Sequence, residues 1–189
     1  MRVVAGKYKG MQIISPPKSV KLRPTSDKIR EAIFDVIRFD LVDTVFVDLF
    51  AGSGAVGIEA ISEGANFVYF VEKNRIALET IKENIQRFGI QNQCELFHID
   101  VFEFLKTFSL TTVDFVFLDP PYRSFYSSKV LEALVNFEYL SDLALVIAEH
   151  LKEEKLLDTY SKFNKLEKFK EKEYGNVVVS FFVNSNKEA

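Results

Sequence analysis

The stretch VFVDLFAGSGAVGIEA, residues 45–60, decides the fold. It begins with a short apolar run, residues 45–50, rich in β-branched and aromatic residues, which predicts a buried strand. The glycines that follow allow the backbone to turn sharply and a ligand to approach closely. From Val56 the apolar residues recur with helical spacing, and Glu59 and Glu63 are predicted to face solvent. A strand, a glycine turn and a helix in this order open a nucleotide-binding βαβ unit.

Two interpretations of the ligand compete at this turn. Gly52, Gly54 and Gly57 match the pattern G-x-G-x-x-G, which alone suggests NAD or FAD. Asp48, however, ends the strand before the turn, and its carboxylate would repel a dinucleotide pyrophosphate. A cationic, amino-acid-like ligand would be attracted instead, and S-adenosylmethionine is such a ligand. We therefore favour the methyl donor, with a glycine turn that serves only strand-to-helix packing as the minor alternative.

Acidic residues recur where each predicted strand ends. Glu72 follows the strand 67–71, Asp100 follows the strand 94–99, and Asp119 follows the strand 113–118. The carboxyl ends of parallel strands face one crevice, so we expect these acids and Asp48 to lie near one ligand. Glu72 lies 18 residues beyond Gly54, close to the usual offset for an acid that accepts both ribose hydroxyls. Asp100 is placed to accept the adenine amino group, with apolar surface from Val101, although a helix N-cap explains Asp100 nearly as well.

The second motif is the sequence DPPY, residues 119–122. Two prolines after a buried strand make a stiff loop, and Pro120 has no N–H. The Asp119 carboxylate and the Pro120 carbonyl can accept the two hydrogens of an exocyclic amino group, while Tyr122 stacks on the base. A turn that is merely rich in proline would explain the two prolines but not the aspartate and the tyrosine that flank them. The motif therefore predicts methylation of an amino group on a nucleobase.

The net charge of −3 conceals an asymmetry. Residues 1–30 hold eight basic residues, among them Lys7, Lys9 and Arg23, and a single acid, Asp27. The rest of the chain is acidic. A basic arm on an acidic body predicts an element that binds a polyanion, with a merely solvated basic segment as the alternative.

The composition excludes other classes of protein. A hydrophobic fraction of 48% with 27% charged residues is ordinary for a soluble globular protein. The sequence holds no apolar run of membrane-spanning length, and Cys94 and two isolated histidines offer no metal-ligand spacing. We expect a cytoplasmic protein without a metal ion or a membrane partner.

The remaining periodicities predict an α/β fold: a Rossmann-like, doubly wound sheet of seven strands, mostly parallel, with an antiparallel C-terminal edge. A small N-terminal β-hairpin and a helix starting at Thr25 or Ser26, with Arg30 and Arg38 on its outer face, precede it. We expect two domains, a basic RNA-binding extension over 1–40 and a methyltransferase domain over 41–189. The other predicted elements are helices at 75–88, 101–108 and 126–138 and strands at 143–149, 165–173 and 177–183.

These motifs together resemble a known family. DLFAGSG (48–54), Glu72-Lys73, Asp100 and DPPY (119–122) are similar to class I S-adenosylmethionine-dependent amino-methyltransferases. RVVAGKYKG (2–10) and RPTSDKIREAIFDVI (23–37) resemble the bacterial family that methylates guanine N2 of small-subunit (16S) ribosomal RNA. The resemblance covers most of the chain to about Tyr126 and implies that this chain is an rRNA (guanine-N2)-methyltransferase.

The resemblance also implies roles for individual residues. Asp119, Pro120 and Tyr122 are the expected catalytic residues. The expected cofactor-binding residues are Asp48, Phe50, Ala51, Gly52, Ser53, Gly54, Glu72, Lys73, Asp100, Val101 and Asp119. The expected contacts to substrate RNA are Lys7, Lys9, Arg23, Thr25, Pro121 and Tyr122. The expected partner is 16S ribosomal RNA or a small-subunit assembly particle, bound by a monomer.

Three alternatives remain open at this point. The DPPY motif also occurs in DNA adenine-N6 and cytosine-N4 methyltransferases, and related motifs serve protein glutamine. An NAD(P)-binding oxidoreductase and a non-catalytic RNA-binding assembly factor are the rivals from other classes.

Overall fold

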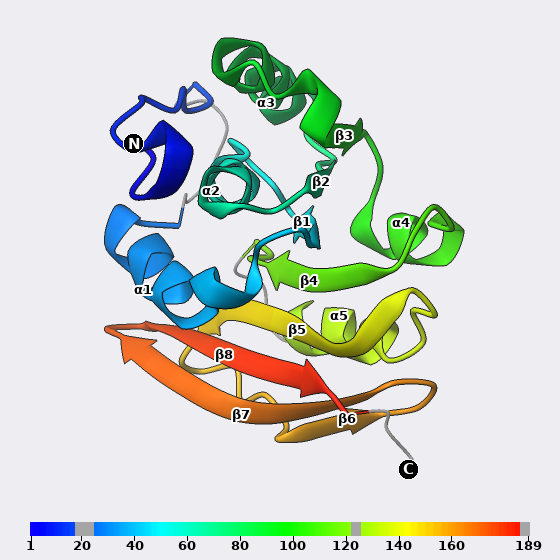
Figure 1. Ribbon diagram of the computed structural model, residues 1–189. Coiled ribbons are helices and arrows are strands. Elements are labelled where there is room, and N and C mark those ends of the chain that lie inside the picture. Colours follow the sequence, from blue (N-terminus) through cyan, green and yellow to red (C-terminus); the bar gives the residue numbers. More distant parts are fainter. Residues whose placement is uncertain (18–24, 122–125, 186–189) are drawn as a thin grey trace. The chain divides into compact units, whose positions relative to one another are not determined.

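The computed structural model describes residues 1–17, 25–121 and 126–185 and divides into two compact units, Met1–Asp100 and Val101–Ala189 (Figure 1). The first unit contains three parallel strands in the order β3-β2-β1. Its elements are η1 (Gly6–Tyr8), α1 (Asp27–Ile37), η2 (Arg38–Asp40), β1 (Val45–Leu49), α2 (Ala55–Glu63), β2 (Phe67–Val71), α3 (Arg75–Phe88), η3 (Gln91–Gln93) and β3 (Cys94–Phe97).

The strand register of the first unit aligns the strand ends. Leu49 of β1 pairs with Val71 of β2, and Val71 pairs with Phe97 of β3. The residues that follow the three strands therefore leave the sheet at one edge. β1 is buried from Phe46 to Leu49, as expected for a parallel strand covered on both faces.

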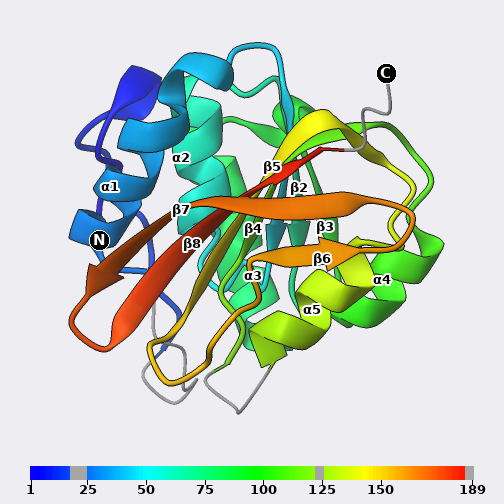
Figure 2. The same ribbon diagram turned by 90° about the horizontal axis from the view of Figure 1, so that it is seen from below.

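The second unit contains α4 (Val101–Thr107), β4 (Val113–Leu118), α5 (Tyr126–Leu134), β5 (Leu140–Leu151), β6 (Thr159–Ser161), β7 (Lys165–Tyr174) and β8 (Val177–Asn184). β4 and β5 are parallel, and β5, β8, β7 and β6 follow one another as antiparallel neighbours. Figure 2 shows β8, β7 and the short β6 side by side. The charged strand β7 reverses into β8 at Gly175, whose φ of +63° is left-handed.

The α/β class, with parallel strands and an antiparallel C-terminal portion, is confirmed. The strands at 45–49, 67–71 and 113–118, the helix at 75–88 and the Ser26 N-cap are also confirmed. The strand count was wrong by one, because the described residues contain eight strands and β6 has only three residues. The helix predicted at 126–138 ends at Leu134. The N-terminal hairpin is present without regular strands: Arg2 and Gln12 form one antiparallel bridge, and the Val3 and Ile13 N–H groups donate to the Met11 and Met1 carbonyls.

Helix α2 is buried on every side, from Ala55 to Ser62. The prediction that Glu59 faces solvent was therefore wrong, and so was the outward position of Arg30 in α1, because both side chains are fully buried. They pair with each other, with Arg30 Nε 2.9 Å from Glu59 Oε2. Sequence periodicity placed both outside because a charge is normally solvated, but a charge can be buried when it is paired and hydrogen-bonded.

The N-terminal segment, residues 1–14, supplies the cover over α2. The Glu59 carboxylate accepts hydrogen bonds from the backbone N–H groups of Val4 and Ala5 at 2.8–3.0 Å. Ser62, one turn further along α2, accepts from the Tyr8 N–H and donates to the Ala5 carbonyl. In Figure 1 this segment (dark blue) lies beside α2. The side chains of α2 thus hold the segment in place.

Replacing Glu59 with Gln should destabilise the fold strongly. The amide cannot neutralise Arg30, which remains buried, and removing one partner of a buried ion pair costs about 3–5 kcal/mol. Urea denaturation measures this as a lower free energy of unfolding. Glu79→Gln, in the exposed Glu79–Lys82 pair, is the control and should change stability by less than about 1 kcal/mol. Equal small effects in both variants would contradict the assigned role of Glu59.

Candidate functional site

The turn between β1 and α2 has an unusual backbone. Phe50, Gly52 and Gly54 have φ values of +64°, +59° and +76°. A left-handed conformation costs a residue with a side chain about 1–2 kcal/mol, so Phe50 is held there by its surroundings. A Cβ added at Gly54 would lie 3.3 Å from the side chains of Ile81 and Phe70. Packing therefore shapes the turn, because the Cα of Gly54 lies close to core side chains that leave little room for a Cβ.

Three backbone N–H groups, two in the turn and one in the first residues of α2, already donate to acceptors of the protein. The Gly52 N–H donates to Glu72 Oε2 at 2.8 Å, and the Gly57 N–H donates to Asp48 Oδ2 at 2.9 Å. The Gly54 N–H donates to the Ala51 carbonyl at 2.7 Å. In a dinucleotide site such groups point at the pyrophosphate. Here the acceptors for two of the three glycines of the G-x-G-x-x-G match are carboxylates of the protein.

Asp48 is a buried carboxyl group with an altered pKa. Burial raises its pKa to about 7, the Gly57 hydrogen bond opposes this shift, and the negative charge of Glu72 adds to it. A buried acid near the α2 N-terminus that is only partly ionised at neutral pH would gain a full charge beside a cationic ligand. This arrangement fits a ligand that carries an ammonium or sulfonium group.

Glu72 connects β2 to the turn. Its Oε2 accepts from Gly52, and its Oε1 accepts from the Asn74 N–H at 2.6 Å. Burial raises the pKa of Glu72, and the hydrogen bonds from Asn74 and Gly52 oppose the shift. Asn74 in turn caps α3 by accepting from the Ile76 and Ala77 N–H groups. The carboxylate thus stands at the strand edge between the turn and the start of α3.

Asp100 lies at the same edge, after β3. It forms an ion pair with Lys73, with Lys73 Nζ 3.0 Å from Asp100 Oδ2. The Lys73 side chain is largely exposed and that of Asp100 is one-third exposed. The first unit therefore brings together Asp48, Glu72, Lys73 and Asp100 with the turn 50–54.

The remaining predicted site residues are placed as follows. Asp119 and Pro120 follow β4 in the second unit, where Asp119 is partly exposed and Pro120 is buried, and Pro121 is exposed. Val101 is the buried first residue of α4. Tyr122 and Arg23 lie outside the described residues. Lys7 and Lys9 are exposed on the N-terminal segment, whereas Thr25 is buried.

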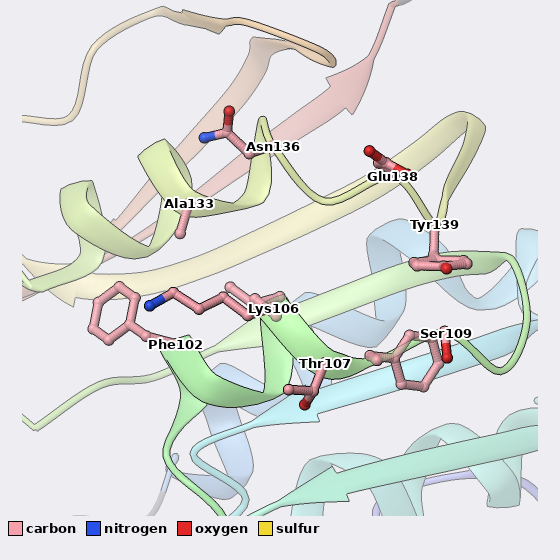
Figure 3. Close-up of a pocket in the computed structure, with 10 residues that line it drawn as sticks. Phe102, Lys106, Thr107, Ser109, Ala133, Asn136, Glu138 and Tyr139 are labelled. Carbon is pink, nitrogen blue, oxygen red and sulfur yellow. The ribbon is translucent and has the colours of Figure 1, made fainter.

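A cavity of about 420 Å³ lies in the second unit between α4 and the end of α5. Figure 3 shows Phe102 and Lys106 of α4 and Tyr139 before β5 around it. None of the predicted site residues lines this cavity.

Within residues 1–17, 25–121 and 126–185, no cluster of three or more His, Cys, Asp or Glu side chains could hold a metal ion. The helices of this part of the chain are all too short or too polar to span a bilayer.

Sequence reasoning missed Asn84, which is fully buried on α3. Its side-chain amide donates to the Ser53 carbonyl in the glycine turn at 2.9 Å and also bonds the backbone of Ile14. The available signal was a polar residue on the apolar face of the helix predicted at 75–88, between Ile81, Ile85 and Phe88.

Comparison with known proteins gives consistent findings. The sequence model of a family described as conserved hypothetical protein 95 matches residues 1–183. A putative rRNA methyltransferase, YlbH of Bacillus subtilis, is 32% identical over 161 residues, which are 84% of this chain and 87% of the relative. The ribosomal RNA small subunit methyltransferase D of Escherichia coli K12 is 31% identical over 149 residues, 79% of this chain and 74% of the relative. The solved structure of the putative methyltransferase yhhF from Escherichia coli superimposes with a TM-score of 0.85 at 27% identity, covering 99% of both chains.

The raised pKa of Asp48 predicts how stability depends on pH. Because the folded pKa is about 7 and the unfolded value about 4, the folded protein binds an extra proton between these values. The contribution of Asp48 to stability should therefore fall as pH rises from 4 to 7. In Asp48→Asn, the side chain can still accept from the Gly57 N–H but does not titrate. The free energy of unfolding of the variant should therefore rise relative to that of the wild type by up to about 1.4 kcal/mol for each pH unit between 4 and 7. Urea denaturation from pH 4 to 8 measures this.

The control for that experiment is Asp35→Asn, which changes an exposed carboxylate of α1. Its stability should follow the wild-type pH profile. A profile for Asp48→Asn that also runs parallel to the wild type would show that Asp48 does not carry the extra proton.

Proposed function

The chain belongs to the family described as conserved hypothetical protein 95, and from this premise we propose that it methylates small-subunit ribosomal RNA. The reaction transfers a methyl group from S-adenosylmethionine to the exocyclic N2 amino group of a guanine in 16S ribosomal RNA. Two relatives support the reaction class: the putative rRNA methyltransferase YlbH and the ribosomal RNA small subunit methyltransferase D match this chain over 87% and 74% of their own length. The choice of guanine N2 rests on the motifs RVVAGKYKG, RPT and DPPY.

One observation carries the choice of ligand. The Gly52 and Gly57 N–H groups donate to the carboxyl groups of Glu72 and Asp48, so acids of the protein already take up two N–H groups that a pyrophosphate would need. A dinucleotide would meet repulsion there, whereas a positively charged ligand relieves the repulsion between the two acids. This favours S-adenosylmethionine over NAD(P).

The residues of the first unit take the following parts in donor binding. Asp48 faces the charged methionine end, Glu72 accepts from the ribose hydroxyls, and Asp100 accepts from the adenine amino group. Lys73 holds Asp100 in place through their ion pair. The backbone and side chains of Phe50, Ala51, Gly52, Ser53 and Gly54 shape the pocket. Val101, the first residue of the second unit, is assigned to the adenine as apolar surface from its place after Asp100 in the sequence.

The residues after β4 hold the base. When bound, the donor supplies a methyl group on a positively charged sulfur. The Asp119 carboxylate and the Pro120 carbonyl accept the two hydrogens of the guanine amino group, which orients the nitrogen lone pair toward that methyl. The N–C bond forms as the S–C bond breaks, and the amine proton leaves to Asp119 or water. Tyr122 stacks on the extruded base and Pro121 borders it.

The N-terminal segment supplies the RNA contacts. Lys7 and Lys9 are exposed and suit phosphate binding. Arg23 and Thr25 are assigned to substrate RNA from the RPT motif alone. We assign residues 1–40 to the RNA-binding extension and 41–189 to the catalytic domain. A monomer would act on 16S ribosomal RNA or on a small-subunit assembly particle in the cytoplasm.

The product of methyl transfer tests this function. Purified protein with labelled S-adenosylmethionine and 16S ribosomal RNA should form N2-methylguanosine, identified by nucleoside mass spectrometry. Asp119→Ala should lower the transfer rate by roughly 10²–10³, the usual scale for loss of a preorganised polar group, while donor binding persists. Asp119→Asn should be milder because its side-chain oxygen still accepts one hydrogen bond.

Asp142→Asn, at an exposed position of the same unit, is the matched control and should transfer at the wild-type rate. N6-methyladenine as the product would overturn the guanine assignment. Absence of any transfer from S-adenosylmethionine to RNA or to assembling particles would overturn the proposed function.

A further inference from the structure

Asn84 joins the N-terminal segment to the glycine turn. Its Oδ1 accepts from the Ile14 N–H, and its Nδ2 donates to the carbonyls of Ile14 and Ser53, each at 2.9 Å. Both amide hydrogens and one acceptor position of the side chain are therefore used, within a fully buried environment. Hydrogen bonds in such surroundings are costly to leave unmade.

Other hydrogen bonds hold the segment from helix α2. Glu59 and Ser62 bind residues 4, 5 and 8 from helix α2. Ser53 lies inside the turn, between Gly52 and Gly54, and its side chain is buried. The Asn84 side chain therefore binds both the segment and the turn.

We propose that Asn84 is a positioning residue that couples RNA binding by the N-terminal segment to donor binding at the glycine turn. The inference rests on the proposed function, because it takes RNA at Lys7 and Lys9 and S-adenosylmethionine at the turn. RNA bound to the segment would restrict the motion of Ile14. Because Ile14 is hydrogen-bonded to the Asn84 amide, this would also restrict the amide and the Ser53 carbonyl to which it donates. Each ligand stabilises the same arrangement, so each strengthens the binding of the other by the same factor.

A purely structural role for Asn84 makes a different prediction. Loss of the three hydrogen bonds would then lower stability and leave the two ligands independent of each other. The coupling factor is the ratio of donor affinities with and without RNA. It separates the two roles because a general loss of stability lowers both affinities equally and leaves their ratio unchanged. The experiment must therefore measure this ratio and not activity alone.

The test uses calorimetric titration with S-adenosylhomocysteine, which does not turn over, in the absence and presence of saturating 16S ribosomal RNA. RNA should tighten binding to the wild type at least about fivefold, the lower end of typical coupling. In Asn84→Ala the factor should fall to about one. Thr80→Val is the control, because Thr80 is buried one turn earlier on α3 and bonds only the Ile76 carbonyl of its own helix. It should keep the wild-type factor.

Two results would overturn the coupling while the proposed function stands. One is a wild type that binds both ligands and methylates RNA with a coupling factor of one; the other is Asn84→Ala with the wild-type factor. Failure of the wild type to bind S-adenosylhomocysteine and to methylate RNA would instead remove the proposed function. If Asn84→Ala does not fold, amide hydrogen exchange of the wild type decides: S-adenosylhomocysteine should slow exchange of the Ile14 N–H, and unchanged exchange overturns the inference.

Discussion

Two buried carboxylates hold the turn on which the rest of the site depends. Asp48 and Glu72, from the ends of two neighbouring parallel strands, accept the N–H groups of Gly57 and Gly52. The same sequence pattern in a dinucleotide site would offer these groups to phosphate. With the acids in place, the turn carries two buried carboxyl groups near a helix N-terminus, which favour a cationic ligand. The chemistry of the site therefore follows from two side chains more than from the glycines.

The second constraint is the attachment of the N-terminal segment. Helix α2 leads directly out of the glycine turn, and its Glu59 and Ser62 bind the segment. The Arg30–Glu59 pair adds α1 to this assembly without exposing either charge. The elements that shape the turn are thus the elements that hold the N-terminal segment, so the RNA contacts and donor contacts that we propose share one scaffold.

The sequence predicted most of the fold because its signals were local. The apolar run 45–50, the glycine turn and the Ser26 cap act within a few residues, and the structure has them. Arg30 and Glu59 were predicted outside because their burial depends on a partner distant in sequence, which periodicity cannot reveal. The same holds for Asn84, whose partners are residues 14 and 53. The roles of the residues at 119–122 remain predictions that rest on their motif.

The central claim is that this acidic glycine turn binds a cationic methyl donor and excludes a dinucleotide. Parallel calorimetric titrations of the wild type with S-adenosylmethionine and with NADH measure it most directly. We expect saturable binding of one S-adenosylmethionine per chain and no heat from NADH. Saturable binding of NADH, with none of S-adenosylmethionine, would contradict it.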